Sequence, residues 1–165
     1  MSTERTMIVL EAGKRRFMLR LVGVAIHDQH VLIHKADFEP FWSLPGGRAE
    51  LMEPSTVGLK REMQEELGTE VNVERMLWMV ENFFDFNGNS YHELGLYFLM
   101  SFPQDSPLLS RVEPWEGDEE GIKLTFKWHP IADLSNIPLV PSFLCHALGD
   151  LPSTTQHIVH LDEAQ

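Results

Sequence analysis

The chain has 165 residues, of which 43% are hydrophobic and 23% are charged, and this balance excludes a disordered or fibrous protein. Asp and Glu outnumber Lys and Arg by 25 to 13, and the net charge of −12 disfavours nucleic acid as a partner because such a surface repels phosphate. The single cysteine, Cys145, excludes an internal disulfide and a thiolate-rich zinc site, and its apolar neighbours predict a small buried side chain.

The sequence lacks the features of a membrane or secreted protein. No apolar run is long enough to cross a bilayer, and the first residues have no long apolar core of the kind that a signal peptide needs. No linker or internal repeat divides the chain. We therefore expect a cytoplasmic protein without a membrane partner. We also expect a single domain over residues 1–165, with a core of about residues 16–150 and peripheral ends.

The first half of the chain begins with two aliphatic, β-branched segments. Residues 16–28 and 29–35 predict consecutive strands, most simply a hairpin. Residues 42–47, WSLPGG, predict a short strand that ends in a turn, because Pro45 has no N–H donor and glycines permit positive φ.

A helix is predicted next, because Pro54 suits a first turn and Gly68 suits the position just beyond the last one. Its core-facing stripe consists of residues at helical spacing: Thr56, Leu59, Met63 and Leu67. Further strands are predicted at residues 71–84, 91–102 and 123–130, the first two joined by a loop over residues 85–90. Residues 131–134 and 141–150 read as helical, and the chain from Pro152 on as loosely ordered. This order predicts a mixed sheet with helices on its faces.

The predicted helix carries a dense group of carboxylates. Glu62, Glu65 and Glu66 share one face, and like charges at this spacing cost about 0.2–0.5 kcal/mol per pair. Arg61 can reach Glu65 but cannot neutralise all three. The face is either a solvated acidic surface or a cation site. Mg²⁺ takes hard oxygen ligands, and a bound cation would let the acidic group accept an anionic polyphosphate.

The whole stretch from Gly47 to Thr69 resembles the Nudix box, the motif of the MutT-like Nudix hydrolases. That pattern is Gly-x5-Glu-x7-Arg-Glu-aliphatic-x-Glu-Glu-x-Gly-aliphatic. The positions that match it are Gly47, Glu53, Arg61, Glu62, Met63, Glu65, Glu66 and Gly68. The sequence departs from the family pattern at Thr69, where an aliphatic residue is usual, and at Met52, where a glycine is common; neither change touches the expected metal ligands.

The resemblance implies a fold and an activity. The fold is an α/β/α sandwich with a central mixed β-sheet and the box as a loop–helix–loop. The activity is that of a Nudix-type pyrophosphohydrolase, in which water attacks phosphorus in a nucleoside diphosphate linked to another moiety, with Mg²⁺ or Mn²⁺. By the same resemblance, Glu65 and Glu66 are metal ligands and Glu62 is a ligand or the base. Arg61 orients the glutamates, Glu53 holds the loop or adds an outer ligand, and the carbonyl of Gly46 is a further ligand.

Several candidates lie outside the box. Many Nudix enzymes use one more acidic residue, for which Glu120 is the first choice and Glu119 the second, with a solvated acidic loop as the alternative. Glu93 is another candidate, and strand alternation separates it from His92. Possible substrate contacts are phosphate binding by Lys35 and Arg48, a contact from His92, and base stacking on Trp42, Phe83, Phe84 or Phe86.

The sequence leaves the substrate open. Residues 68–102 lack the proline of ADP-ribose pyrophosphatases and the motif of NADH pyrophosphatases, which leaves a nucleoside triphosphate or a small nucleotide conjugate. The alternative to an enzyme is a non-catalytic Nudix module that senses a nucleotide, but such modules commonly lose box glutamates that are all present here. A Nudix-like isomerase is the weakest option. Whether the chain forms a homodimer stays open.

Overall fold

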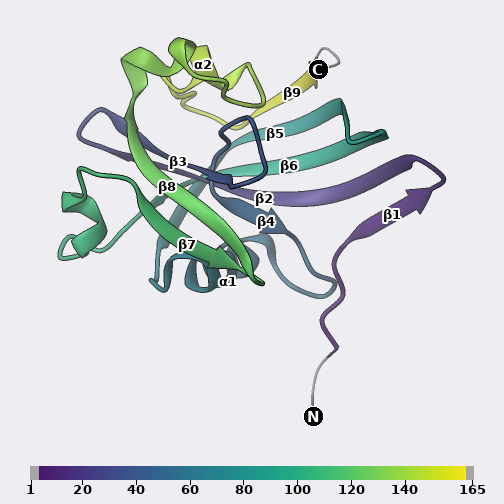
Figure 1. The fold of residues 1–165 in the computed structure, drawn as a ribbon, viewed down its shortest axis with the longest axis horizontal. Helices are drawn as coiled ribbons and strands as arrows, with labels where there is room; N and C mark the ends of the chain where they lie inside the picture. Colours follow the sequence, from purple (N-terminus) through teal and green to yellow (C-terminus); the bar gives the residue numbers. More distant parts are fainter. Residues whose placement is uncertain (1–3, 163–165) are drawn as a thin grey trace.

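The structure, a computed structural model, describes residues 4–162. In this part of the chain nine strands, two α-helices and two 3₁₀ helices (η1 and η2) are present (Figure 1). In chain order these elements are β1 (Val9–Ala12), β2 (Arg15–His27), β3 (His30–Ala36), β4 (Gly46–Arg48), α1 (Ser55–Leu67), β5 (Asn72–Phe86), β6 (Asn89–Ser101), η1 (Pro107–Ser110), β7 (Trp115–Glu119), β8 (Ile122–Pro130), η2 (Ile131–Asn136), α2 (Leu144–Ala147) and β9 (Gln156–Leu161).

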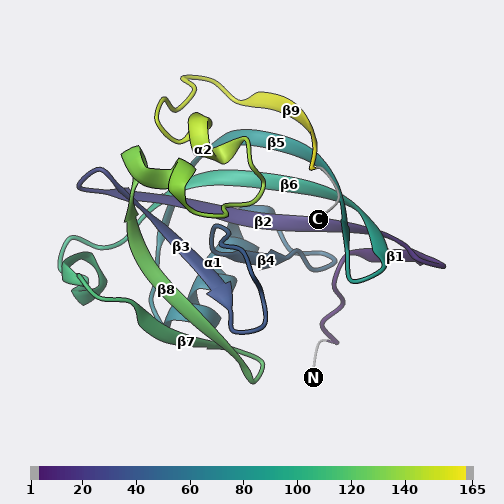
Figure 2. The ribbon, with the colours of Figure 1, turned by 45° about the horizontal axis from the view of Figure 1, so that its top comes forward.

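The strands form a mixed sheet in the order β7-β8-β3-β2-β6-β5-β9, with β1 and the short β4 paired to β2. Strand β2 runs parallel to β6 along most of its length, but it pairs with β3 only beside their turn, at Ile26–Val31 and His27–His30. Beyond that turn the two strands diverge, and β3, β8 and β7 fan away from β2 (Figure 2). The sheet therefore opens into two halves, and the opening leaves room for a site.

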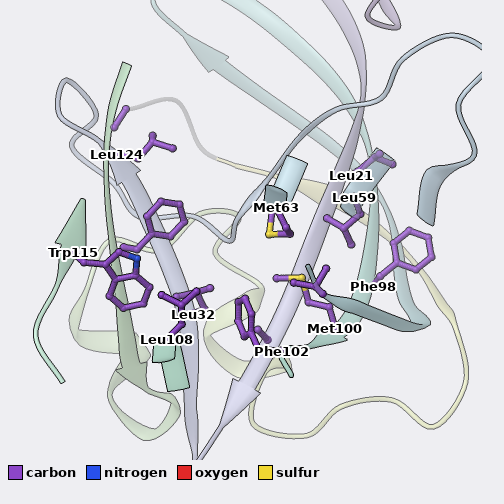
Figure 3. Close-up of a cluster of buried hydrophobic side chains, with 14 of the residues drawn as sticks. Leu21, Leu32, Leu59, Met63, Phe98, Met100, Phe102, Leu108, Trp115 and Leu124 are labelled. Carbon is purple, nitrogen blue, oxygen red and sulfur yellow. The ribbon is translucent and has the colours of Figure 1, made fainter. Parts of the chain in front are cut away.

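Apolar side chains pack on both faces of the sheet. Leu59 and Met63 of α1 are fully buried and pack with Leu21 of β2 in the cluster of Figure 3. On the other face, Leu134 of η2 and Leu144 of α2 pack in a second cluster with strand residues such as Val22, Trp78 and Tyr97. Each buried side chain of this size stabilises the fold by about 1.5–3 kcal/mol. Helices thus cover both faces, and the predicted α/β class with a mixed sheet is confirmed.

The locally encoded elements are where the sequence predicts them. The first two segments form the β2–β3 hairpin. Helix α1 begins after Pro54 and ends at Gly68, whose left-handed conformation (φ 65°) lets its N–H bond to the carbonyl of Gln64 at 3.0 Å. Asn87 and Gly88 both have positive φ and form the tight β5–β6 turn. The predicted core-facing stripe of α1 is only partly correct. Thr56 is exposed, and the buried face of the helix also includes Glu62 and Glu66.

The structure of the later chain differs at three places from what the sequence suggested. The segment from Pro152 on is not loose, because β9 pairs in parallel with the free edge of β5. Residues 116–121 are not a plain loop, because β7 and β8 form an antiparallel hairpin there. Residues 141–150 contain only the single-turn helix α2, where Cys145 is partly rather than fully buried. No helix among residues 4–162 is both long and apolar enough to span a bilayer.

Candidate active site

A cleft of about 460 Å³ lies where β2 and β3 diverge. Glu62 and Glu65 of α1 and Glu119 at the end of β7 line one part of it. Its other parts are lined by β2, by the segment between β3 and β4, and by the cleft-facing side chains of β5 and β6. The cleft therefore joins an acidic wall to a floor of strand side chains.

Glu62, Glu66 and Glu119 form the carboxylate group of this cleft, with one oxygen from each lying within 4.8 Å of the others. Glu66 is only 4% exposed, and neither of its carboxylate oxygens has a hydrogen-bond partner in the described chain. Burial raises the pKa of Glu66 well above its usual range, and the nearby charges of Glu119 and Glu62 raise it further. A buried, unpartnered carboxylate among like charges is the donor set that a hard divalent cation such as Mg²⁺ or Mn²⁺ prefers, so these residues fit the expected ion.

The Pro-Gly-Gly turn lets the backbone lie against this group. A Cβ on Gly47 would stand 2.2 Å from the carboxylate carbon of Glu62, so a larger residue would displace that side chain. Gly46 has φ 157°, and a Cβ there would stand 2.0 Å from the carbonyl oxygen of Leu21. Gly46 also lines the cleft. Its carbonyl as a metal ligand stays a prediction.

Arg61 holds the other box glutamates in place. Its guanidinium donates to both oxygens of Glu53, at 2.7 and 3.0 Å, and to Glu62 at 2.9 Å and Glu65 at 3.3 Å. These bonds to Arg61 are the main reason that the pKa of Glu53 is lowered. The arrangement has the geometry expected if Arg61 orients the glutamates and Glu53 ties the loop to the helix.

Glu65 occupies a different position from its predicted partner Glu66. Its carboxylate lies 2.8 Å from Arg5 and 3.3 Å from Arg61, and it is outside the carboxylate group. Arg5 also contacts Glu50 at 2.6 Å, because the start of the described chain pairs with the loop before α1. Glu65 lines the cleft, and its role as a ligand stays a prediction.

Of the two acidic candidates just outside the box, the structure brings Glu119, the second choice from the sequence, into the carboxylate group, and the role of either residue stays a prediction. Glu119 is the last residue of β7 and points into the carboxylate group. Glu120 lines the cleft but sits in the β7–β8 turn with φ 50°, and it is not a member of the group. The two neighbours differ because residues 115–119 form a strand, whose alternation the sequence alone did not reveal.

Replacing Glu119 with Gln should raise the Mg²⁺ concentration for half-maximal activity at least about tenfold, because a carboxylate next to the ion becomes neutral. Glu120→Gln, which removes the same charge one residue later, should change it by no more than about twofold. The measurement is a Mg²⁺ titration of hydrolysis for both variants, with thermal unfolding to show that both are folded. Equal effects of the two substitutions would contradict this assignment.

Two cleft residues were missed by the sequence reading. Arg20 of β2 lines the cleft, and its only side-chain hydrogen bond within residues 4–162 goes to the carbonyl of Leu44 at 3.5 Å. Burial lowers the pKa of Arg20, but Glu93 and the other carboxylates more than offset this and raise it. His34 of β3 lies 3.8 Å from Glu66, and burial together with Arg20 lowers its pKa to about 3, so it is neutral at pH 7. The available signal for Arg20 was a charged residue set between apolar neighbours, Leu19 and Leu21, in a strand.

Some of the side chains predicted to contact the substrate face the cleft, and others lie on the opposite face of their strand. Arg48 lines the cleft, as predicted for a phosphate contact. Lys35 does not, because it alternates with the cleft-lining His34 and lies over the ring of Trp42 at 5.0 Å. His92 also faces away, since it alternates with Glu93 and stacks on Phe83 at 4.4 Å. The structure therefore does not bring Lys35 or His92 into this cleft, which is against their predicted contacts with a substrate bound there. Of the four aromatic candidates, those that line the cleft are Phe84 and Phe86.

Comparison with known proteins identifies the family. Residues 18–144 match the model of the NUDIX domain. The chain belongs to the Nudix family. The predicted enzyme class, a Nudix-type pyrophosphohydrolase, is confirmed. Among curated Nudix relatives, the 8-oxo-dGTP diphosphatase of Buchnera aphidicola subsp. Schizaphis graminum (strain Sg) is 25% identical over 147 residues, which cover 85% of this chain and 88% of the relative.

Solved Nudix structures share the fold. A NUDIX hydrolase from Nitrosomonas europaea superposes with a TM-score of 0.59 at 14% identity, covering 88% of this chain and 79% of that one. An ADP-ribose pyrophosphatase from Streptococcus suis 89-1591 superposes with a TM-score of 0.56 at 15% identity, covering 86% of this chain and 98% of that one. At such low identity these similarities support the Nudix fold alone.

Proposed function

We propose that this Nudix protein is a divalent-metal-dependent enzyme that cleaves the pyrophosphate bond of a nucleoside triphosphate or another nucleoside diphosphate derivative. One observation carries the proposal. The carboxylate group contains a buried glutamate, Glu66, with both oxygens unpartnered beside a cleft. Such a group is costly in a folded protein unless a cation neutralises it. The similarity to a protein named 8-oxo-dGTP diphosphatase supports a nucleotide as the substrate.

Glu62, Glu66 and Glu119 would hold the metal in this enzyme. When bound, the ion supplies Lewis-acid polarisation of a phosphoryl oxygen and lowers the pKa of a water. Arg20 and Arg48 line the same cleft and can donate hydrogen bonds to phosphate oxygens, which offsets the strongly acidic surface of the chain. Water attacks one phosphorus of the pyrophosphate, the bridging P–O bond breaks, and two phosphorylated fragments leave.

The part of the cleft beyond Arg20 fits the organic portion of a nucleotide. Phe84 and Tyr91 stack there with ring centroids 4.9 Å apart, and Phe41 meets Phe86 edge to face at 5.6 Å. Aromatic walls of this kind suit the flat face of a base. This part of the cleft supports a nucleotide over inorganic pyrophosphate.

The test is phosphate and pyrophosphate release from nucleoside triphosphates, ADP-ribose and UDP-sugars, with and without Mg²⁺ or Mn²⁺. We expect metal-dependent release from one substrate class by the wild type and by Glu70→Gln, a matched charge change at an exposed site just beyond α1. Glu66→Gln should lose this activity. If no compound is hydrolysed but nucleotides still bind, the chain is a non-catalytic Nudix sensor and the proposal fails.

A further inference from the structure

Two buried polar side chains lie side by side on the cleft floor. Asn82 of β5 and Glu93 of β6 are direct cross-strand partners, are 4% and 6% exposed, and line the cleft. The Asn82 amide lies beside the Glu93 carboxylate across the two strands. Burial raises the pKa of Glu93, and Arg20 and Asn82 partly offset this rise.

This pair has no internal partner that accounts for it. The Asn82 carbonyl oxygen is without a hydrogen bond, and Glu93 forms no salt bridge, as far as the described residues extend. Arg20 attracts Glu93 electrostatically but does not pair with it within 4 Å. Buried acceptors in native proteins nearly always have donors. Neither side chain belongs to the carboxylate group of the metal site. A ligand bound in the cleft can supply the missing donors.

The neighbouring side chains suit a flat ring. Phe84 and Tyr91 are the next cross-strand pair on the same face, and their rings are nearly parallel, with an interplanar angle of 5°. On the other side, the ring of Tyr97 lies over Gly95, where a Cβ would stand 2.7 Å from it, and Tyr97 lines the cleft. A base that enters the cleft beside these rings would bring its hydrogen-bonding edge to Asn82 and Glu93.

The donors and acceptors on the hydrogen-bonding edge of a base decide which base fits this pair. Two adjacent acceptors require two adjacent donors, and guanine supplies them with its ring N1–H and its 2-amino group. Adenine and cytosine place a ring lone pair beside their amino group, which would face a carboxylate. Uracil has one N–H between two carbonyls. We propose that Asn82 and Glu93 are specificity-determining residues that select a guanine-type base. This inference rests on the proposed function, which it refines.

The test compares the Kd of guanosine 5′-monophosphate with that of inosine 5′-monophosphate, which lacks only the 2-amino group. Both are measured by calorimetry with Mg²⁺ present. Wild type should prefer the guanine nucleotide by roughly 10- to 100-fold, the usual effect of losing a hydrogen bond to a charged group. In Glu93→Gln the preference should fall below about threefold. Glu81→Gln is the matched control, because Glu81 precedes Asn82 on β5, faces away and pairs with His157 at 2.9 Å; it should keep the preference.

The affinities of other nucleotides and of ribose 5-phosphate show whether the pair recognises a guanine base, another base or the sugar. Equal Kd values for the guanine and inosine nucleotides would overturn the proposal, and so would tighter binding of the adenosine, cytidine or uridine monophosphate. Ribose 5-phosphate that binds as tightly as the guanine nucleotide would also overturn it, because the pair would then contact sugar hydroxyls. The proposed function is tested separately, by comparing the rate of metal-dependent hydrolysis in wild type and in Glu66→Gln. An enzyme that is active but shows no preference between bases would contradict this inference and leave the proposed function intact.

Discussion

Replacing Glu66 with glutamine should abolish metal-dependent hydrolysis and at the same time make the metal-free protein more stable. The loss of activity should be about 10²- to 10⁴-fold, because a metal that is no longer held cannot contribute its several kcal/mol of transition-state stabilisation. The gain in stability follows from the same residue, since its charge is buried without a partner next to Glu62 and Glu119. Removing that charge should raise the free energy of unfolding by about 1–3 kcal/mol.

The stabilisation should depend on pH in a defined direction. The folded protein raises the pKa of Glu66 above its ordinary value of 4.5, so the folded state holds this proton more tightly than the unfolded state. Wild-type stability is therefore lost as pH rises through 4.5 towards the folded pKa. The advantage of Glu66→Gln should be small below pH 4, grow above pH 4.5 and level off beyond the folded pKa.

Denaturant unfolding of both proteins without metal, across this pH range, measures the effect. Glu70→Gln is the control, because it removes an exposed charge just beyond the same helix and should change neither activity nor stability appreciably. If metal-free Glu66→Gln is less stable than wild type, the carboxylate has an internal structural role and the interpretation is wrong.

Replacing Arg61 with glutamine should damage both stability and activity. The guanidinium bonds Glu53, Glu62 and Glu65, so its removal leaves Glu53 and Glu62 without their cation, while Glu65 keeps its contact with Arg5. With allowance for solvent screening of this partly exposed group, the free energy of unfolding should fall by about 1–3 kcal/mol. Misplacement of Glu62 should lower kcat/KM by about 10- to 100-fold, the usual effect of losing a residue that orients a metal ligand.

The cost of the Arg61 substitution should disappear in acid. Bonds from Arg61 lower the folded-state pKa of Glu53, so the stability they give is present above the ordinary value of 4.5 and is lost as pH falls through the folded pKa. Arg61→Lys should recover part of the stability but little of the activity, because an ammonium cannot donate to both Glu53 oxygens in parallel. Arg75→Gln is the exposed control. A stability loss that persists below the folded-state pKa of Glu53 would point to lost packing instead of lost ion pairs.

The sequence predicts the features that depend on neighbours along the chain. Helix α1 and its ends at Pro54 and Gly68 follow from local periodicity and capping, and the Asn87-Gly88 turn from the φ values that those residues tolerate. The close approach of Gly47 to Glu62 explains why a glycine occupies a fixed position before the acidic helix. These features require no knowledge of how distant segments pair.

Features that depend on pairing between distant segments were not predictable in the same way. Whether Glu119 or Glu120 joins the carboxylate group depends on the register of β7 against β8, and a shift of one residue reverses the answer. Strand β9 pairs with the free edge of β5, a contact between segments about 75 residues apart in the chain that the local sequence does not reveal. Arg5 meets Glu65 because the start of the chain pairs with residues 49–51. Each of these contacts is set by the folded sheet.

The most direct test of the account is the binding of Mn²⁺ to wild type and to Glu66→Gln, followed by electron paramagnetic resonance without substrate. The account predicts that wild type binds Mn²⁺ at a site where Mg²⁺ competes. Glu66→Gln, folded and at least as stable, should bind the ion at least about tenfold more weakly. If the two proteins bind Mn²⁺ with equal affinity, the buried carboxylate group of Glu62, Glu66 and Glu119 is not the metal site.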